Sequence, residues 1–392
     1  MRFNLWEDCN RVPLTELLSF VVDNRGKTVP TAPSGHKLIA TNCVTNNALF
    51  PVYEKIRYLS EETYQTWFRA HPIPGDILFV NKGTPGRVCL VPDPVDFCIA
   101  QDMIALRADE SKIYPKYLFA VLRSREIQQQ IYNTNVGDVI PHFKKQFLDQ
   151  LLIPIPERSI QESIGDLYYV LSLKAERNKK INDNLADLLQ TVYQERFGDT
   201  SLIANQGILS DICSYSRDKV AVSELNVSTY FSTENMLSGK AGSTEATSLP
   251  TTSQTTACHK GDTLISNIRP YFKKIVYCED KCGCSTDVLC FTPSQPRYSA
   301  YLFSTLYADK FFAFMVAGSK GTKMPRGDKQ QIMTYPVVLP SEEELAGFNT
   351  IASPLLEQIY SNSAENKRLS ILRDTLLPKL MSGEIDVSAI QL

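Results

Sequence analysis

Apolar residues recur at alternating steps of four and three in two long stretches of the chain, roughly 160–192 and 348–380. This period of 3.5 residues is typical of a coiled-coil seam rather than of a helix that lies on a globular core. Polar residues interrupt both patterns at the same place: Lys174, Asn178, Asn362 and Asn366. The pattern predicts two long helices of close to 40 residues each. Two unrelated amphipathic surface helices are the alternative.

Short apolar runs bounded by Gly and Pro precede each predicted helix, and they indicate β-strands. The chain has "PGDILFVNKGTPGRVCLV" from Pro74 to Val91 and "KGDTLISNIRPYFKKIVY" from Lys260 to Tyr277. Both segments contain Gly-Asp, an apolar run, an Asn, a loop with cations and a second apolar run. Further matched blocks follow in the same order, namely 100–106 with 285–291, 114–124 with 298–308, and 151–156 with 335–340. Such ordered similarity indicates an internal duplication.

Each copy predicts an α+β domain of about 150 residues, which is long enough for its own core. Strands are expected at 76–80 and 87–91, helices at 115–132 and 299–316, and short edge strands at 151–156 and 335–340. The expected boundaries are 1–157 for the first domain, 158–200 for the central helix, 201–340 for the second domain and 341–392 for the last helix. If a pseudo-two-fold axis relates the copies, the long helices run antiparallel, and their polar positions meet and fix the register.

The composition adds little to this organisation. The 41 Lys and Arg nearly balance the 43 Asp and Glu, but the two domains are neutral to basic and the two helices are acidic. This favours a polyanionic partner for the domains, although chance variation of surface charge is the alternative. No apolar run of about 18 residues and no signal peptide is found, so we expect a cytoplasmic protein without a membrane partner. Its ten Cys are then expected to be reduced thiols.

The usual catalytic signatures are missing from the sequence, including the phosphate-binding loop, the His-Glu-x-x-His motif and the nucleophile elbow. Four Cys between Cys278 and Cys290 do not have the paired spacing of a zinc site, so we expect thiols and no metal. Asp262 and the triplet Glu279-Asp280-Lys281 resemble the acidic pattern of metal-dependent nucleases. A nuclease that uses Asp262, Glu279 and Lys281 is therefore one alternative, and a coiled-coil adaptor that binds proteins is another.

Polar and basic loops occur at matching places in both copies. Asn and Arg or Lys side chains can contact base edges, and Lys also binds phosphates. Solvated loops without a ligand are the alternative for any single residue. Gly75-Asp76 and Gly261-Asp262 are expected to be structural, with Gly in a turn and Asp as its hydrogen-bond acceptor. The candidates for DNA binding are Asn81, Lys82, Thr84, Arg87, His142, Lys144, Lys145, Asn267, Arg269, Lys273, Lys274, Lys320, Lys323 and Arg326.

Over almost its full length the chain resembles the DNA-specificity subunits of type I restriction–modification systems. The resemblance rests on the doubled Gly-Asp-strand-Asn block, on "STDVL" before a Tyr-Leu-Phe helix, and on "LLIPIP", "YPVVLP" and the closing "LRDTLLPKLMSGEI". It implies two target-recognition domains in a pseudo-two-fold arrangement, joined by two long antiparallel coiled-coil helices. Each domain would bind one half of a split, asymmetric DNA sequence. Lys82-Gly83-Thr84 replaces Ile268-Arg269-Pro270, so the two domains should recognise different half-sites.

The resemblance also implies the partners. The helices would set the spacer between the half-sites and dock two modification (methyltransferase) subunits, and translocating restriction subunits would join them on double-stranded DNA. The chain itself would be non-catalytic and bind no cofactor. S-adenosylmethionine, ATP and Mg are expected on the partner subunits.

Overall fold

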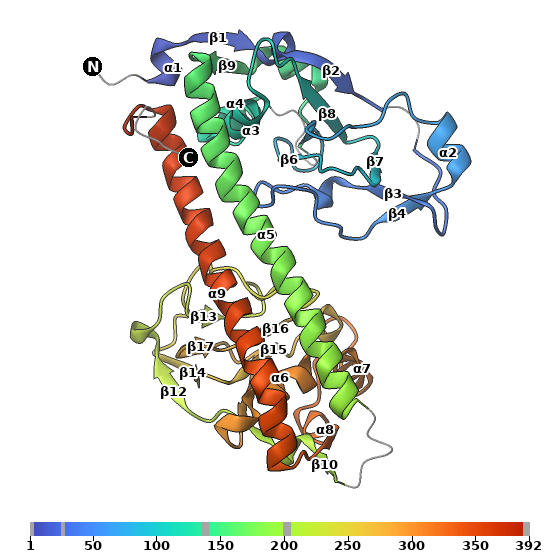
Figure 1. The fold of residues 1–392 in the computed structure, drawn as a ribbon, viewed down its shortest axis with the longest axis vertical. Coiled ribbons are helices and arrows are strands. Elements are labelled where there is room, and N and C mark those ends of the chain that lie inside the picture. Colours follow the sequence, from blue (N-terminus) through green and yellow to red (C-terminus); the bar gives the residue numbers. More distant parts are fainter. Residues whose placement is uncertain (1–3, 25–27, 135–140, 199–204, 387–392) are drawn as a thin grey trace. The chain divides into compact units, whose positions relative to one another are not determined.

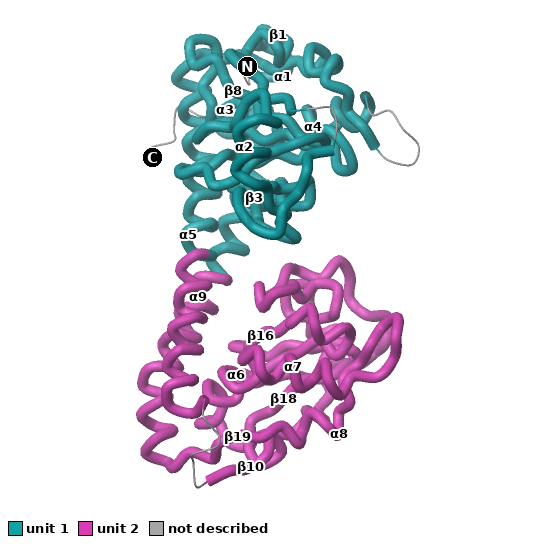
Figure 2. The backbone as a smooth tube through the Cα atoms, turned by 90° about the vertical axis from the view of Figure 1, so that its right-hand side faces the viewer, with its two compact units in different colours: residues 1–179, 364–392 teal, residues 180–363 magenta. Residues whose placement is uncertain are grey.

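The computed structural model describes residues 4–24, 28–134, 141–198 and 205–386. The chain divides into two compact units, with residues 1–179 and 364–392 in unit 1 and residues 180–363 in unit 2 (Figure 2). The boundary passes through both long helices, so each unit contains part of each helix. No helix in the described ranges is long and apolar enough to span a bilayer.

Unit 1 contains three small sheets (Figure 1). The largest is antiparallel, with the strand order β2-β8-β5-β6; a second has the order β4-β3-β7, and β1 pairs with β9. The strands are β1 (Asn10–Pro13), β2 (Leu18–Val22), β3 (His36–Ile39), β4 (Arg57–Leu59), β5 (Ile77–Val80), β6 (Val88–Leu90), β7 (Phe97–Ile99), β8 (Met103–Ala108) and β9 (Leu152–Ile155). The shorter helices are α1 (Leu5–Asp8), α2 (Glu61–Thr66), α3 (Pro115–Leu122) and α4 (Arg125–Asn133).

Unit 2 also has three sheets, with the orders β11-β18-β15-β16, β12-β14-β17-β13 and β10-β19. Its strands are β10 (Gln206–Ile208), β11 (Cys213–Tyr215), β12 (Lys219–Ala221), β13 (Tyr230–Phe231), β14 (Gln254–Cys258), β15 (Thr263–Ser266), β16 (Ile275–Tyr277), β17 (Cys282–Cys284), β18 (Val288–Pro293) and β19 (Pro336–Val338). Its shorter helices are α6 (Ser299–Tyr307), α7 (Asp309–Ala317) and α8 (Lys329–Ile332).

The two units repeat one architecture. The order β2-β8-β5-β6 matches β11-β18-β15-β16, and the pair β1-β9 matches β10-β19. A parallel strand pair also recurs, β3 with β7 in unit 1 and β13 with β17 in unit 2. These correspondences confirm the internal duplication and the α+β class predicted from the sequence.

The Tyr-Leu-Phe block fills the core of each unit with the same tyrosine. The Tyr117 hydroxyl donates a hydrogen bond to the Pro154 carbonyl at 2.8 Å, and the Tyr301 hydroxyl donates one to the Val338 carbonyl at 2.6 Å. Both tyrosines are fully buried, so the bond to β9 or β19 satisfies a hydroxyl that has left water. The tyrosine thus fixes the closing strand of each copy to its core helix.

The predicted helix over 115–132 is two helices, and so is its counterpart over 299–316. In unit 1 the chain breaks after α3, and the Ser124 hydroxyl caps α4 by accepting a hydrogen bond from the Ile127 amide. In unit 2 the extended residue Ala308 separates α6 from α7. Apolar spacing alone missed these breaks because apolar residues resume soon after each of them, at Ile127 and at Phe311.

The predicted long helices are confirmed as α5 (Arg158–Phe197) and α9 (Glu342–Met381), each of 40 residues. Within unit 1, the Asn178 side-chain amide donates to the Asn366 side-chain oxygen at 3.0 Å, and Lys174 forms an ion pair with Glu365 at 3.5 Å. Within unit 2, the Asn362 amide donates to the Asn182 side-chain oxygen at 2.8 Å. The polar residues singled out from the sequence therefore face the partner helix, and Asn182 joins them although the seam pattern did not include it.

Candidate nucleic-acid interface

The Gly-Asp pairs build the turn that leads into β5 and β15. Gly75 has φ 86° and Gly261 has φ 90°, a conformation that favours glycine. The Asp76 carboxylate accepts a hydrogen bond from the Ile73 amide at 3.0 Å, and the Asp262 carboxylate accepts one from the His259 amide at 2.8 Å. These residues are structural, in agreement with the interpretation of the sequence.

Asn81 and Asn267 directly follow β5 and β15. Their side chains lie inside the protein. They are only 4% and 7% exposed. The Asn81 carbonyl accepts from the Phe143 amide at 2.8 Å, and the Asn267 carbonyl accepts from the Gly327 amide at 3.3 Å. The two amides therefore lie beneath the loop surface, and contact between them and bases stays a prediction. Their backbone holds a second loop.

That second loop brings distant parts of the sequence together in each unit. In unit 1, the Gly83 amide donates to the Pro141 carbonyl at 2.9 Å. In unit 2, the Arg269 amide donates to the Pro325 carbonyl at 2.7 Å. In each unit, the early loop after the strand (81–87 or 267–274) thus contacts the late loop (141–146 or 319–329). We call the surface that these two loops form the composite loop surface of that unit. Residues 136–140, which begin the late loop of the first copy in the sequence, lie outside the described residues.

In unit 1 the composite surface carries several of the predicted DNA-binding residues. Lys82 lies 3.8 Å from the Asp102 carboxylate, and Lys145 lies 3.2 Å from the Asp23 carboxylate. Lys144 is exposed, whereas Thr84, Arg87 and His142 are half-buried. The exposed Lys82–Asp102 pair contributes about 0–1 kcal/mol, so a phosphate could displace this carboxylate at small cost, whereas Asp23 is mostly buried.

In unit 2 the composite surface has more candidate cations than in unit 1, and more of them contact other residues of the domain. Four of them contact acidic side chains or backbone: Lys273 with Asp309 at 2.9 Å, Lys320 with Asp328 at 2.6 Å, Arg326 with Asp287 at 3.0 Å, and the Lys274 ammonium with the Thr233 carbonyl at 2.5 Å. Lys323 is exposed and Arg269 half-buried. Burial lowers the pKa of Lys274, and its ammonium is directed at the protein backbone, so Lys274 is better suited to holding the loop than to binding a phosphate.

Three features of this surface were not found from the sequence. Lys240 pairs with Asp309 at 2.8 Å beside Lys273, so two cations share one carboxylate, and the two cations lower its pKa. The aromatic rings of Tyr271 and Phe272 project from the early loop, and Met324 projects from the late loop. The order Arg-Pro-Tyr-Phe-Lys-Lys, with aromatic residues between cations, is a signal that could have revealed the rings.

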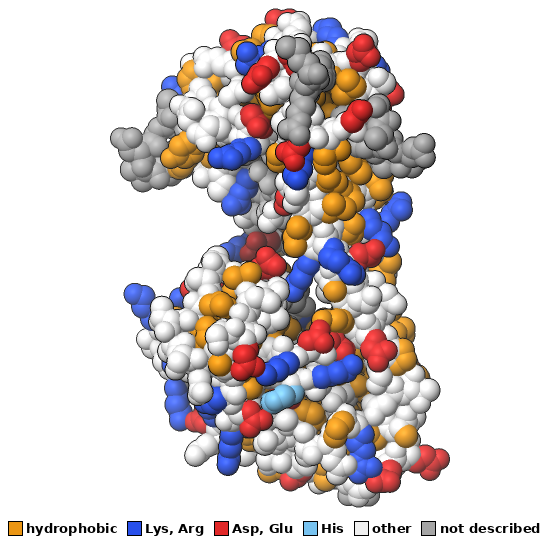
Figure 3. Space-filling model, turned by 90° about the vertical axis from the view of Figure 1, so that its left-hand side faces the viewer, with side chains coloured by type: hydrophobic (Ala, Val, Ile, Leu, Met, Phe, Trp, Pro, Cys, Tyr) orange, Lys and Arg blue, Asp and Glu red, His pale blue; other side chains and the backbone are white. Residues whose placement is uncertain are grey.

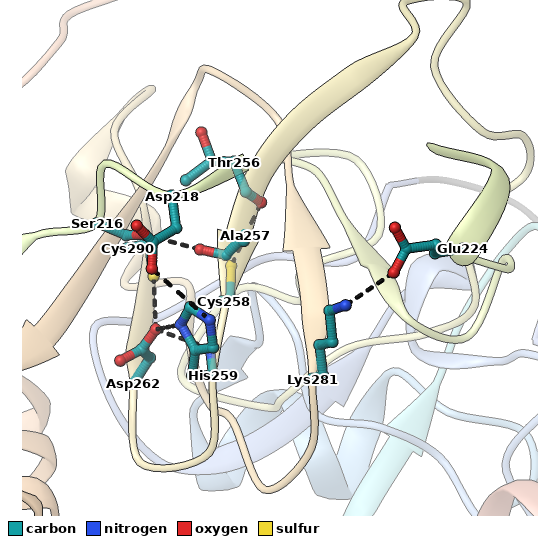
Figure 4. A network of polar contacts seen from close by, with 10 residues as sticks. All are labelled: Ser216, Asp218, Glu224, Thr256, Ala257, Cys258, His259, Asp262, Lys281 and Cys290. Carbon is teal, nitrogen blue, oxygen red and sulfur yellow. Dashed lines mark hydrogen bonds and ion pairs between the residues drawn. The ribbon is translucent and has the colours of Figure 1, made fainter. Parts of the chain in front are cut away.

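The residues proposed for a nuclease do not come together as an active site in the described structure. Asp262 is buried, where its carboxylate lies 3.2 Å from the Cys290 sulfur, and burial raises its pKa. Lys281 is directed away from Asp262 and bonds to Glu224 at 2.8 Å (Figure 4). Within the described ranges, no group of three His, Cys, Asp or Glu side chains is arranged to hold a metal ion. Cys258, Cys278, Cys282, Cys284 and Cys290 form part of a small buried core.

The comparisons with known proteins agree with this geometry. Residues 21–186 match the family described as type I restriction modification DNA specificity domain. The chain is 20% identical over 346 residues to the MjaIX specificity subunit of Methanocaldococcus jannaschii, which covers 80% of this chain and 78% of that protein. Residues 21–186 therefore contain a domain of the type I DNA-specificity family.

A second relative and a solved structure extend the comparison. The HindI specificity subunit of Haemophilus influenzae is 25% identical over 153 residues, which is 38% of this chain and 33% of that protein. The crystal structure of a type I restriction–modification S subunit from M. genitalium is 18% identical, covers 97% of this chain and 98% of its own, and has a TM-score of 0.60. That structure shares the fold of this chain.

Proposed function

We propose that this specificity subunit recognises a two-part, asymmetric DNA sequence, with one domain for each half, and that it has no catalytic activity of its own. The observation that carries the proposal is the composite loop surface of each unit. Each surface is built on a corresponding strand, β5 or β15, on the Asn that follows it and on matching backbone hydrogen bonds. The exposed side chains of the two surfaces differ. A scaffold shared by the two units, with unlike side chains, suits the recognition of two unlike sequences.

The long helices have a different role in the proposal. They set the unread spacer between the half-sites and dock two methyltransferase subunits, which restriction subunits join. In support, Val170, Ile371 and Leu372 leave apolar side chains exposed on α5 and α9 within unit 1. Hydrophobic side chains also gather in a patch on the face drawn in Figure 3. Exposed apolar patches of this kind mark protein interfaces. S-adenosylmethionine, ATP and Mg would bind to these partners.

The experiment is to map the methylated bases in DNA that has been modified by the assembled complex. The proposal expects methylation at one motif with two specified parts and an unspecified gap of fixed length. A single uninterrupted motif, or methylation without sequence preference, would contradict it.

A further inference from the structure

The early loop of unit 2 presents two aromatic side chains to solvent. Tyr271 is 50% exposed and Phe272 is 37% exposed, and their ring centroids lie 4.7 Å apart. Met324 of the late loop is 51% exposed. Leaving such side chains in water forgoes about 1.5–3 kcal/mol for each that could be buried. An apolar cluster on an otherwise polar loop surface therefore indicates a binding site.

The backbone holds these rings in a fixed position. Pro270–Phe272 form one turn of 3-10 helix, and the residues on both sides, Arg269 and Lys273, have φ 51°. Non-glycine residues rarely adopt this left-handed conformation, which costs of order 1 kcal/mol or more at each position. Strain of this kind persists only where the surrounding structure imposes it.

Two neighbouring segments impose it here. The Arg269 amide donates to the Pro325 carbonyl at 2.7 Å. The Gly239 amide donates to the Phe272 carbonyl at 2.8 Å, and the Lys240 amide donates to the Lys273 carbonyl at 2.9 Å. The loop is thus attached at both of its ends before any ligand arrives. A ligand that contacts the rings would therefore lose little free energy to ordering the loop.

The cations around the rings account for only part of a DNA contact. Lys240 and Lys273 both pair with Asp309, and Lys320 and Lys323 lie on the late loop. These side chains suit phosphate groups, which carry no sequence information directly. The Phe272 ring has no donor to offer a phosphate, and the carbon face of the Tyr271 ring has none either, so these ring surfaces suit an apolar group on the nucleic acid.

We propose that Tyr271 and Phe272 contact the 5-methyl group of a thymine in the half-site that unit 2 recognises. This methyl group is the apolar feature in the major-groove pattern of donors and acceptors. The inference rests on the proposed function and adds one specified base to it. Unit 1 has Gly83-Thr84-Pro85 in the corresponding loop, without an aromatic ring, so the inference concerns one half-site only.

The test replaces thymine with deoxyuridine, which lacks this methyl group. Duplexes with the mapped site are substituted at each thymine of the unit 2 half-site in turn, and binding to the full complex is measured. One substitution should weaken binding about three- to fivefold, the effect of one buried methyl group. The double variant Tyr271→Ala, Phe272→Ala should bind the thymine and deoxyuridine duplexes equally.

Control variants separate this contact from a general defect. Tyr271→Phe keeps the ring and should keep the preference for thymine. Ile208→Ala truncates another exposed apolar side chain of unit 2, outside the loops, and should change nothing. An unchanged preference in the double variant, or no thymine whose substitution weakens binding, would overturn the inference while leaving the two-part motif intact. The melting temperature of each variant verifies its folding.

Discussion

At the scale of single residues, the two units have a buried aspartate at corresponding positions, Asp76 and Asp262, but in different environments. Asp76 forms two hydrogen-bonded contacts with the Arg107 guanidinium, at 2.9 and 3.0 Å. At the corresponding position of β18 stands Thr292, so Asp262 has no arginine beside it. Its nearest basic group is the His259 ring at 3.8 Å, which is charged only when protonated, so the desolvation of Asp262 is not offset by a permanent cation. The two aspartates should therefore respond differently to the same substitution.

The substitutions Asp76→Asn and Asp262→Asn test this difference. Asp76→Asn leaves Arg107 without its carboxylate and should lower the free energy of unfolding by about 2–3 kcal/mol. Asp262→Asn keeps an oxygen for the His259 amide and removes a buried charge, so it should be neutral or stabilising near pH 8. Urea denaturation of both variants measures the two changes. Equal losses would contradict this account.

The pH dependence of stability should come in part from Asp262. Burial raises its pKa from the ordinary value of 3.8, although His259, Cys290 and Thr292 partly oppose the shift. The folded chain then holds this proton more tightly than the unfolded chain does. Its contribution to the free energy of unfolding is present below about pH 4 and falls as pH rises through the raised pKa.

The measurement is the melting temperature of the chain between pH 4 and pH 8, with and without Asp262→Asn. The variant should show a smaller fall over this range. Glu279, whose pKa burial also raises, should leave part of the fall in place. Identical profiles for the two proteins would contradict the assignment.

Residue-level prediction from the sequence succeeded for the glycines but did not foresee that the asparagine side chains are buried. Gly75 and Gly261 were correctly placed in turns because a Gly-Asp pair before an apolar run has few other uses. Asn81 and Asn267 were predicted to bind DNA because an Asn side chain can contact base edges. Their burial depends on late loops that are far away in sequence, and no local pattern contains that information.

At the scale of elements, the polar residues of α5 and α9 decide how the helices pair. Asn178 is buried, and its amide donates to Asn366, whose own amide donates to the Ala175 carbonyl at 3.1 Å. Buried polar contacts of this kind cost stability in a coiled coil but select one register. The helices were predictable because a 3.5-residue period over ten seam positions is a strong signal.

Substitutions at this contact should separate stability from register. Asn178→Ala leaves Asn366 with an unpaired oxygen and should cost about 1–2 kcal/mol in thermal or urea unfolding. Replacing both Asn178 and Asn366 by Leu should raise stability and admit alternative registers, which cysteine cross-linking between the helices would detect. A single cross-linking register in the double variant would contradict the role given to the asparagines.

The sheets built from β3, β4 and β7 and from β12, β13, β14 and β17 were not predicted in full. Their strands have only two to five residues. Segments this short carry too few alternations of apolar and polar residues to identify a strand. These strands pair with segments that are far away in the sequence, so they can be identified only in the folded domain.

At the scale of the whole molecule, the loop cations should supply affinity without sequence preference. Lys144 in unit 1 and Lys323 in unit 2 are exposed on the composite loop surfaces. Each Lys→Gln variant should weaken binding of the complex to all duplexes alike, and it should make the slope of log affinity against log salt shallower by about one. Arg158→Gln, at the start of α5, is the control and should leave the slope unchanged. Weakening confined to one DNA sequence would contradict the phosphate role.

The central claim is that each domain recognises its own half of the DNA site. The most direct measurement exchanges residues 205–340 for the matching domain of another specificity subunit and maps the bases that the assembled complex methylates. The account predicts that one half of the motif changes to that of the donor, while the other half and the gap between them stay the same. An unchanged motif, or a change in both halves, would contradict it.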